Sequence, residues 1–331
     1  MGASGASIDK PRGRVKGQNC MERVLVTGGA GFIGSHLVEL LLDTGATVLV
    51  VDDFRCGKHE HLADAADRGD LTVHQGDIRS SQDMQIIDEF GPDTVFHLAA
   101  LHFIPYCDAH PQEAFEVNVL GLDTVIRALR RSPLARFVFP SSGAIYGFAD
   151  TPRGEDSAPE PKGTYGLSKW MGEQLVARLH ADRPDVSTAV ARLFNTYGPR
   201  ETNPHVIPEI LAALRTGEVV HLGNMWPRRD LVFVTDTARG LLAAATANGF
   251  NVFNVGTGVG TSIADVVAAL EGIRGEPMRV VEDPARIRAD DGHLVADPAR
   301  LRLHTGWSAA YDLTDGLREL LVAEGLVYDP V

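Results

Sequence analysis

Short apolar runs and longer amphipathic stretches alternate along the first half of this chain. Apolar runs typical of buried strands lie at 23–27, 47–51, 71–75, 94–98 and 136–140. Amphipathic stretches typical of helices lie at 35–42, 81–90, 111–131 and 165–183. Strands that alternate with helices favour parallel pairing through helical crossovers. We therefore predict an α/β fold, a doubly wound parallel sheet of the Rossmann type with helices on both faces.

Composition limits the classes of function. The chain has 331 residues, which suggests about two lobes, and its 44% hydrophobic content is ordinary for a globular protein. The net charge of −13 argues against nucleic acid as a partner, because a nucleic-acid surface must be basic. No run approaches the roughly 20 apolar residues of a membrane span. We expect neither nucleic acid nor a membrane as a partner.

The cysteines and the N-terminal residues bear on cellular location. Cys20, Cys56 and Cys107 are odd in number and form no C-x-x-C pair, so we predict no disulfide framework, no metal site and a cytoplasmic location. Residues 1–20 lack the apolar core of a secretory signal. We expect Met21 to be the natural start and residues 1–20 to be a disordered arm or a cloning remnant.

A glycine-rich turn follows the first predicted strand. Gly28, Gly31 and Gly34 would allow a tight turn, close approach of backbone N–H groups to a pyrophosphate, and close packing of helix on strand. The start of the next helix supplies free N–H groups for the anion. Asp52 and Asp53 end the second strand eighteen residues after Gly34, near the spacing expected for a ribose-binding carboxylate. A carboxylate there favours NAD over NADP.

Further candidate residues follow the third and fourth strands. Asp77, which precedes Ile78, could accept a hydrogen bond from an adenine amino group or could cap the next helix. The small residues in Leu98-Ala99-Ala100 would let a flat cofactor pass close to the sheet. This part of the chain therefore continues the predicted dinucleotide site.

A substrate wall is predicted beside that site. The loop at 101–110, which contains His102 and Tyr106, mixes aromatic and polar groups at the carboxyl end of a strand. Asn118 lies among apolar residues of the next helix and would be either a structural bridge or an active-site orienter. The segment 150–163 is rich in Pro, Gly and acidic residues, and it predicts a loop or lid.

Tyr165 and Lys169 are four residues apart, so both project from one face of a helix. A tyrosine with its ordinary pKa of about 10 is a poor base at neutral pH. We predict that the Lys169 ammonium, with a positive nicotinamide, lowers the pKa of Tyr165. Ser142, at the end of the fifth strand, would bind the same substrate hydroxyl. Together these residues predict proton removal from an alcohol as hydride leaves its carbon.

The chain resembles the extended short-chain dehydrogenase/reductases and, more narrowly, the NAD-dependent nucleotide-sugar epimerase/dehydratase family. The resemblance runs from Met21 to the C-terminus. It rests on Gly28-Gly29-Ala30-Gly31-Phe32-Ile33-Gly34, Asp77-Ile78, His97-Leu98-Ala99-Ala100, Ser142, Tyr165-x-x-x-Lys169 and the segments 192–200, 228–236 and 254–258.

The resemblance implies NAD as the cofactor and a nucleotide-diphosphate sugar, a UDP-sugar, as the substrate. The implied catalytic residues are Ser142, Tyr165 and Lys169. The implied cofactor contacts are Gly28, Gly31, Phe32, Ile33, Gly34, Asp52, Asp53, Asp77, Ile78, Leu98, Ala99, Ala100, Asn118, Tyr165 and Lys169. The implied substrate contacts are His102, Ser142, Gly143, Asn195, His205, Val206, Arg229 and Arg288, with Arg286 as an alternative to Arg288.

The residues after Ser142 bear on the reaction. Family dehydratases carry Asp-Glu there, and family decarboxylases usually carry Glu where this chain has Ala144. Gly143 and Ala144 cannot transfer protons, so the resemblance implies a 4-epimerase that acts on a UDP-hexose such as UDP-glucose or UDP-galactose. A UDP-glucuronate decarboxylase or a 4,6-dehydratase is the alternative. The unusual loop at 101–110 leaves 3,5-epimerisation or reduction of another sugar open. A non-catalytic NAD-binding sensor is the alternative from a different class.

The resemblance also implies two lobes and a dimer. We expect 21–195 and 228–258 to form the NAD-binding domain, and 196–227 and 259–331 to form a smaller C-terminal α/β substrate-binding lobe. Trp226 would stack on uracil or pack in the core. The helices at 111–131 and 165–183 have apolar faces that in relatives pair across a homodimer.

Overall fold

A seven-stranded parallel sheet forms the centre of the larger part of the molecule. The computed structural model describes residues 21–287 and 292–327. The strand order is β10-β6-β5-β4-β1-β2-β3, and every neighbouring pair is parallel. The strands are β1 (Arg23–Thr27), β2 (Thr47–Asp52), β3 (Leu71–Gln75), β4 (Thr94–His97), β5 (Arg136–Ser142), β6 (Ser187–Leu193) and β10 (Phe250–Val255). The predicted Rossmann-type α/β fold is confirmed.

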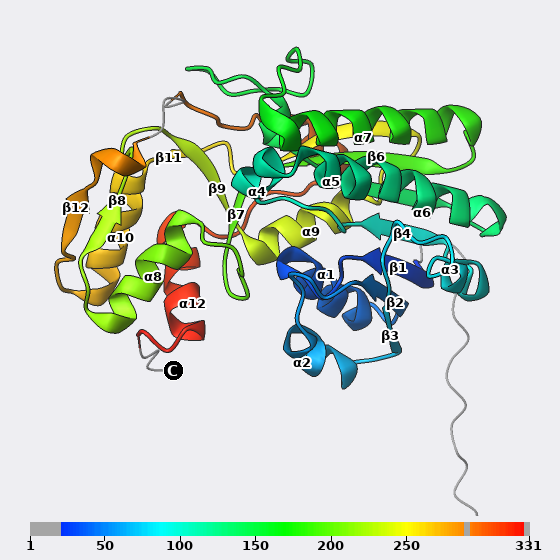
Figure 1. The fold of residues 1–331 in the computed structure, drawn as a ribbon, viewed down its shortest axis with the longest axis horizontal. Helices are drawn as coiled ribbons and strands as arrows, with labels where there is room; N and C mark the ends of the chain where they lie inside the picture. The colour runs from blue at the N-terminus through cyan, green and yellow to red at the C-terminus, as the bar shows by residue number, and fades with distance from the viewer. Residues whose placement is uncertain (1–20, 288–291, 328–331) are drawn as a thin grey trace, which may run out of the picture.

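Helices cover both faces of this sheet (Figure 1). One face is covered by α1 (Phe32–Asp43), α9 (Val234–Ala244) and α11 (Ala299–Thr305). The other face is covered by α3 (Gln85–Phe90), α6 (Leu122–Ala128) and α7 (Gly163–Asp182). The central strands are buried on both sides, and Leu25 and Val26 of β1 have no exposed surface. This explains why their sequences are apolar runs without alternation.

A second group of elements packs around a separate core, at the left in Figure 1. Its helices are α8 (Val206–Thr216), α10 (Ile263–Arg274) and α12 (Leu313–Ala323). β8 (Val220–Leu222) pairs in parallel with β12 (Val280–Glu282). A three-stranded sheet consists of β7 (Asn195–Tyr197), β9 (Arg229–Phe233) and β11 (Gly260–Thr261). Ser262 and Asp265 form a capping box that starts α10.

The chain crosses between the two groups more often than we predicted. β9 lies outside the seven-stranded sheet, although 228–258 was assigned to the NAD-binding domain. α11 packs on α9 and β10 of the large sheet, although it lies within 259–331. β9 and α11 thus pack across the predicted boundaries, and the division into two domains at those boundaries remains a prediction.

Several predicted elements have different bounds. α1 begins at Phe32 rather than at residue 35, and α3 begins at Gln85 rather than at residue 81. The predicted loop at 101–110 contains a helix, α4 (Ile104–Ala109), which starts with a proline in its first turn. The stretch predicted as one helix at 111–131 consists of α5 (Pro111–Phe115), a π-helical segment η2 (Glu116–Gly121), α6 and a final turn η3 (Leu129–Arg131).

Short helical turns complete the described fold. They are η1 (His59–Leu62), α2 (Ala63–Ala66), η4 (Gly143–Ile145) and η5 (Pro284–Arg286). None of the helices in the described ranges is long and apolar enough to cross a lipid bilayer. The segment 150–163 was predicted as a loop or lid; residues 150–162 contain no helix or extended strand, and α7 begins at Gly163.

Candidate active site

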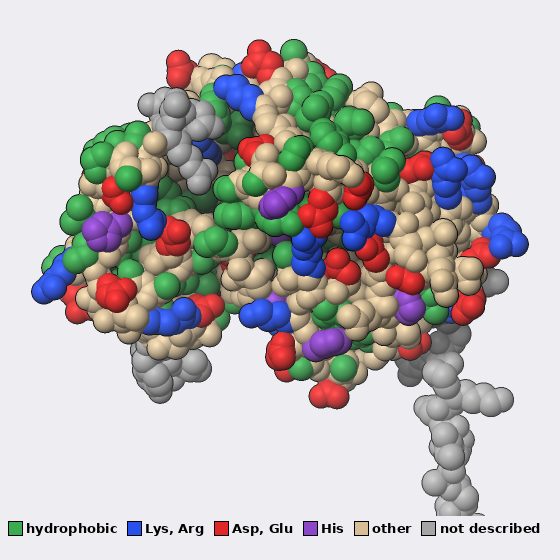
Figure 2. All heavy atoms as spheres, viewed as in Figure 1, with side chains coloured by type: hydrophobic (Ala, Val, Ile, Leu, Met, Phe, Trp, Pro, Cys, Tyr) green, Lys and Arg blue, Asp and Glu red, His purple; other side chains and the backbone are tan. Residues whose placement is uncertain are grey.

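A large cavity lies where the carboxyl ends of β1, β2, β4 and β5 meet the smaller group of elements. Its volume is about 1180 Å³, and its walls include Gly28 and Ser142 on one side and Val206 and Leu222 on the other. Figure 2 shows the surface hollowed between the two parts. Small-ligand sites usually measure about 300–1,000 Å³. This cavity therefore has room for a dinucleotide together with a second ligand.

The glycine turn has the geometry of a phosphate cradle. Gly28 has a φ of +71°, and a Cβ atom built on it would lie 2.6 Å from the Ala99 nitrogen. A Cβ atom on Gly34 would lie 2.2 Å from the Gly28 oxygen. No side chain caps the start of α1, where Gly31 is the N-cap residue. The first-turn N–H groups are thus left for a ligand, and the residues present fit a dinucleotide pyrophosphate.

The two strand-end aspartates have different partners. Asp52 is buried and accepts hydrogen bonds from the backbone nitrogens of Ala30 and Phe54, both at 2.9 Å. Burial raises the pKa of Asp52. Asp53 is exposed, lines the cavity and accepts from the Arg55 nitrogen at 3.0 Å. Asp52 therefore shapes the turn, and Asp53 is the carboxylate better placed for a ribose hydroxyl.

Asp77 and Ile78 both line the cavity, but the Asp77 carboxylate is already paired. Arg79 donates to both Asp77 oxygens, at 2.6 and 2.8 Å for the shortest bonds. Hydrogen bonds from Arg79 lower the pKa of Asp77. An adenine amino group would have to share this carboxylate with Arg79, which the sequence pattern did not indicate.

Asn118 is a structural bridge. Its Oδ1 accepts from the Leu101 nitrogen at 2.7 Å, and its Nδ2 donates to the Leu101 oxygen and to Ser168 Oγ, both at 2.9 Å. Asn118 is buried and is not part of the cavity wall, whereas Leu98, Ala99 and Ala100 are. Asn118 thus bridges the 101–110 segment and α7, which is one of the two roles predicted for it, and its assignment as a cofactor contact stays a prediction.

Ser142, Tyr165 and Lys169 come together at the end of β5. The Ser142 side chain hydrogen-bonds the Tyr165 hydroxyl, and Ser142 Oγ accepts from the Ala144 nitrogen at 3.1 Å. Lys169 is buried, and its Nζ donates to the Pro140 oxygen at 2.8 Å. All three side chains line the cavity. The arrangement places a phenol, a hydroxyl and an ammonium group around one position at the end of the sheet.

The pKa of Tyr165 shifts in the direction opposite to our prediction. Burial raises it to about 12, and the Ser142 hydrogen bond lowers it by less. Burial also lowers the pKa of Lys169 to about 8, against opposing effects of Cys107 and Glu173. The prediction relied on the charges of Lys169 and of a positive nicotinamide, and it did not consider burial, which disfavours the charged form of each group.

Glu173 and Arg192 form a buried ion pair that contacts Ser141, the residue before Ser142. Arg192 Nη2 lies 2.8 Å from Glu173 Oε2, and the two side chains are 5% and 4% exposed. Ser141 Oγ donates to Glu173 at 2.5 Å, so the pair holds the strand residue that precedes Ser142. Sequence reasoning missed this pair, although Glu173 follows Lys169 by four residues on the same helical face.

Two histidines and a carboxylate lie together in the cavity wall. His102 Nε2 accepts from Asn203 Nδ2 at 2.7 Å, and burial lowers the pKa of His102. His205 Nδ1 lies 3.6 Å from Glu201, whose side chain is 7% exposed. Burial acts to raise the pKa of Glu201, but His205, the Asn203 nitrogen and His102 together lower it. The sequence predicted His102 and His205 in this wall but not Glu201.

Of the other predicted substrate residues, all but Arg288 can be placed in the cavity wall. Gly143, Asn195, Val206 and Arg229 line the cavity. Arg229 Nη1 donates to the Gly292 oxygen at 2.6 Å, and its guanidinium lies over the Phe148 ring. Arg286 also lines the cavity, whereas Arg288 lies outside the described residues.

Trp226 was expected to stack on a base or to pack in the core. Its side chain is 73% exposed and is not part of the wall of the large cavity. Neither expectation for this residue agrees with the structure.

A family model and a curated relative both match most of this chain. The model of the NAD dependent epimerase/dehydratase family matches residues 24–256. UDP-glucose 4-epimerase 3 of Oryza sativa subsp. japonica is 33% identical, over 89% of this chain and 88% of its own length.

Two crystal structures are similar over almost the whole chain. The UDP-glucose 4-epimerase of Thermus thermophilus in complex with NAD has a TM-score of 0.83 and 31% identity, covering 92% of this chain and 100% of its own. The UDP-glucose 4-epimerase of Thermotoga maritima with UDP-glucose has a TM-score of 0.84 and 29% identity, covering 92% and 98%.

Proposed function

Because the chain belongs to the NAD-dependent epimerase/dehydratase family, we propose that it is an NAD-dependent 4-epimerase of UDP-hexoses, an isomerase of the UDP-glucose/UDP-galactose type. One observation carries the proposal beyond the family. Ser142, Tyr165 and Lys169 share one cavity with the glycine turn, and the residues after Ser142 are Gly143 and Ala144. The site therefore holds a proton acceptor for an alcohol, but no acid–base pair at the positions where a dehydratase carries one.

Each catalytic residue has a distinct role in this proposal. NAD, held by the glycine turn, would supply the hydride acceptor for C4 of the sugar and the hydride donor to its opposite face. Tyr165 accepts the proton of the C4 hydroxyl and later returns it, and Ser142 orients that hydroxyl. Lys169 adds positive charge beside the phenolate as it forms. Because burial disfavours the phenolate, this charge and that of the oxidised nicotinamide must offset it.

The walls of the cavity support separate binding regions. We assign Gly28, Gly31, Phe32, Ile33 and Gly34 to the pyrophosphate of NAD and Asp53 to its ribose. The sugar would lie between Ser142 and the wall that contains His102 and His205. Asn195 and Arg229 would contact the diphosphate, because arginine forms charge-assisted bonds with phosphate oxygens. These assignments rest on the residues' places in the cavity.

Product analysis tests the function. Purified protein should convert UDP-glucose to UDP-galactose without added NAD, as followed by NMR of the sugar. Separate incubations with UDP-N-acetylglucosamine and UDP-glucuronate would define the hexose. A pentose with CO₂ would instead indicate a decarboxylase, and a 4-keto-6-deoxy sugar would indicate a dehydratase. No turnover of any sugar, with NAD bound, would favour a non-catalytic sensor.

Replacing Gly34 by Ala should lower the affinity for NAD by at least about tenfold, which corresponds to about 1.4 kcal/mol. The added Cβ atom would lie 2.2 Å from the Gly28 oxygen, so the turn must open. Titration of the NAD-free protein with NADH, followed by fluorescence, measures the change. Gly272→Ala is the matched control, since nothing lies within 4 Å of its added Cβ atom. Equal affinities in the two variants would remove the turn from the cofactor site.

We also propose that the protein is a cytoplasmic homodimer. Large apolar side chains are exposed on η2 and α7, namely Leu120 at 59% and Leu167 and Met171 at 41% each. Such side chains support a helix-mediated contact between two copies. The free cysteines Cys56 and Cys107 fit a reducing compartment. Light scattering of the wild type and of Leu120→Lys should give a dimer and a monomer, respectively.

A further inference from the structure

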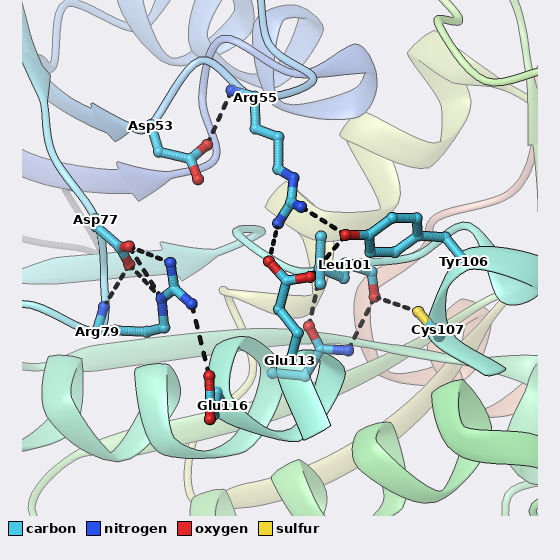
Figure 3. Close-up of polar contacts among 10 residues, drawn as sticks. Asp53, Arg55, Asp77, Arg79, Leu101, Tyr106, Cys107, Glu113 and Glu116 are labelled. Carbon is cyan, nitrogen blue, oxygen red and sulfur yellow. Dashed lines mark hydrogen bonds and ion pairs between the residues drawn. The ribbon is translucent and has the colours of Figure 1, made fainter. Parts of the chain in front are cut away.

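Three charged or polar side chains from three separate elements meet beside the cavity (Figure 3). Arg55 extends from the loop after β2, Tyr106 belongs to α4 and Glu113 belongs to α5. Arg55 Nη1 donates to Glu113 at 2.6 Å and Nη2 donates to the Tyr106 hydroxyl at 2.7 Å. The Tyr106 hydroxyl donates to the other Glu113 oxygen at 2.7 Å. The three groups close a ring of hydrogen bonds, which we call the Arg55 latch.

The latch joins two segments that flank the glycine turn in the order of the sheet. β1 lies between β2 and β4, and its carboxyl end leads into the glycine turn. Arg55 follows β2, whereas Tyr106 and Glu113 belong to the helices that follow β4. Of the three latch residues, Arg55 lines the cavity, and so do Ile104 and Pro105, which precede Tyr106 on α4.

Tyr106 of the latch also shares an apolar cluster with the proposed catalytic residue Tyr165. Tyr106 and Tyr165 both pack against the small apolar cluster of Leu101, Cys107 and Ala114. At neutral pH the latch is an ion pair, because a glutamate ionises well below pH 7. Hydrogen bonds from Arg55 and Tyr106 lower the pKa of Glu113 further, to about 2. The guanidinium also lies over the Tyr106 ring, 5.2 Å from its centre.

We propose that the Arg55 latch retains NAD in the cavity, so that the cofactor must wait for the latch to open before it dissociates. This inference rests on the proposed function, in which the same NAD molecule is regenerated in each turnover. Retention is useful to such an enzyme because a cofactor lost in its reduced form leaves an oxidised sugar behind. Arg55 acts here through Glu113 and Tyr106 rather than by contacting the phosphates.

The dissociation rate of NAD tests the latch directly. The protein is loaded with radiolabelled NAD and diluted into excess unlabelled NAD, and the label that remains bound is followed by filter binding. Glu113→Gln should raise the dissociation rate about tenfold, because it removes the charge that holds Arg55. Arg55→Gln and the double variant should give the same rise, since either change opens the ring. High salt should accelerate release from the wild type but not from Glu113→Gln.

Asp88→Asn is the matched control. Asp88 forms an exposed ion pair with Arg131 at 2.6 Å, and neither residue lines the cavity. The variant removes the same charge as Glu113→Gln and should leave the dissociation rate unchanged.

Other results would overturn the proposal. Slower release from Glu113→Gln would mean that Glu113 holds Arg55 away from the phosphates. Equal release from the wild type, Glu113→Gln and Asp88→Asn, with epimerase activity intact, would overturn the latch alone. A wild type that binds no NAD would overturn the latch and the proposed function together.

Discussion

Replacing Tyr165 by Phe should lower the rate of epimerisation by about 10²- to 10⁴-fold, the usual contribution of a general acid–base group. The change removes one hydroxyl group, which is hydrogen-bonded by Ser142 and lies in the cavity wall. The aromatic ring, which packs on Leu101 and Cys107, is kept. We therefore expect the fold and the NAD content to remain close to those of the wild type. The measurement is the initial rate of UDP-galactose formation from UDP-glucose, with bound NAD quantified in the same sample.

Tyr311→Phe is the control for this change. Tyr311 packs its ring on Phe233 in the smaller core, and it is not part of the cavity wall. Its removal of a hydroxyl group should leave the rate unchanged. If Tyr165→Phe retained more than about a tenth of the wild-type rate, another group would have to accept the proton. His102 and Glu201, which also line the cavity, would then be the groups to test.

Replacing Glu173 by Gln should lower the free energy of unfolding by about 3–5 kcal/mol, because it leaves the Arg192 charge buried without its partner. Arg192 forms two bonds with the carboxylate, at 2.8 and 3.0 Å, and its side chain is only 5% exposed. The Ser141 hydroxyl also loses a charged acceptor. Urea unfolding followed by circular dichroism measures the change.

Asp182→Asn on the same helix is the matched control. Asp182 lies 3.6 Å from Arg178, and both side chains are exposed, at 68% and 79%. Such a pair contributes about 0–1 kcal/mol, so the control should unfold almost as the wild type does. Equal destabilisation by the two substitutions would show that burial of the Glu173–Arg192 pair has no special cost. A variant with both Glu173 and Arg192 replaced by apolar residues should recover part of the loss.

Local sequence pattern was sufficient for the fold class and for many of the residues that line the cavity, but not for Arg55 or Glu201. Parallel strands buried on both faces must be apolar throughout, so β1 and β2 could be recognised without knowledge of their neighbours. The glycine turn was predictable for a similar reason. Glycine is favoured at the φ of +71° of Gly28 and is required by the close contact at Gly34, and both requirements are local.

Element bounds within the first half were less predictable. Residues 104–109 are helical although their aromatic and polar composition suggests a loop, because Pro105 starts a helical turn and Cys107 packs into a buried cluster. The π-helical segment 116–121 lies within a continuous amphipathic pattern, and it has no local signal. In both places, packing against α7 decides the backbone conformation.

The hydrogen-bond partners of side chains and the protonation of buried groups were decided by the tertiary structure alone. Asn118 bonds to Ser168, which is 50 residues away, and Arg55 bonds to Glu113, which is 58 residues away. No pattern in one segment specifies such a pair, because the two residues meet only when the crossovers have formed. The pKa of Tyr165 rises for the same reason, since burial is a property of the assembled site. The sequence by itself thus determined the elements and the candidate residues, and the tertiary structure determined their contacts and charges.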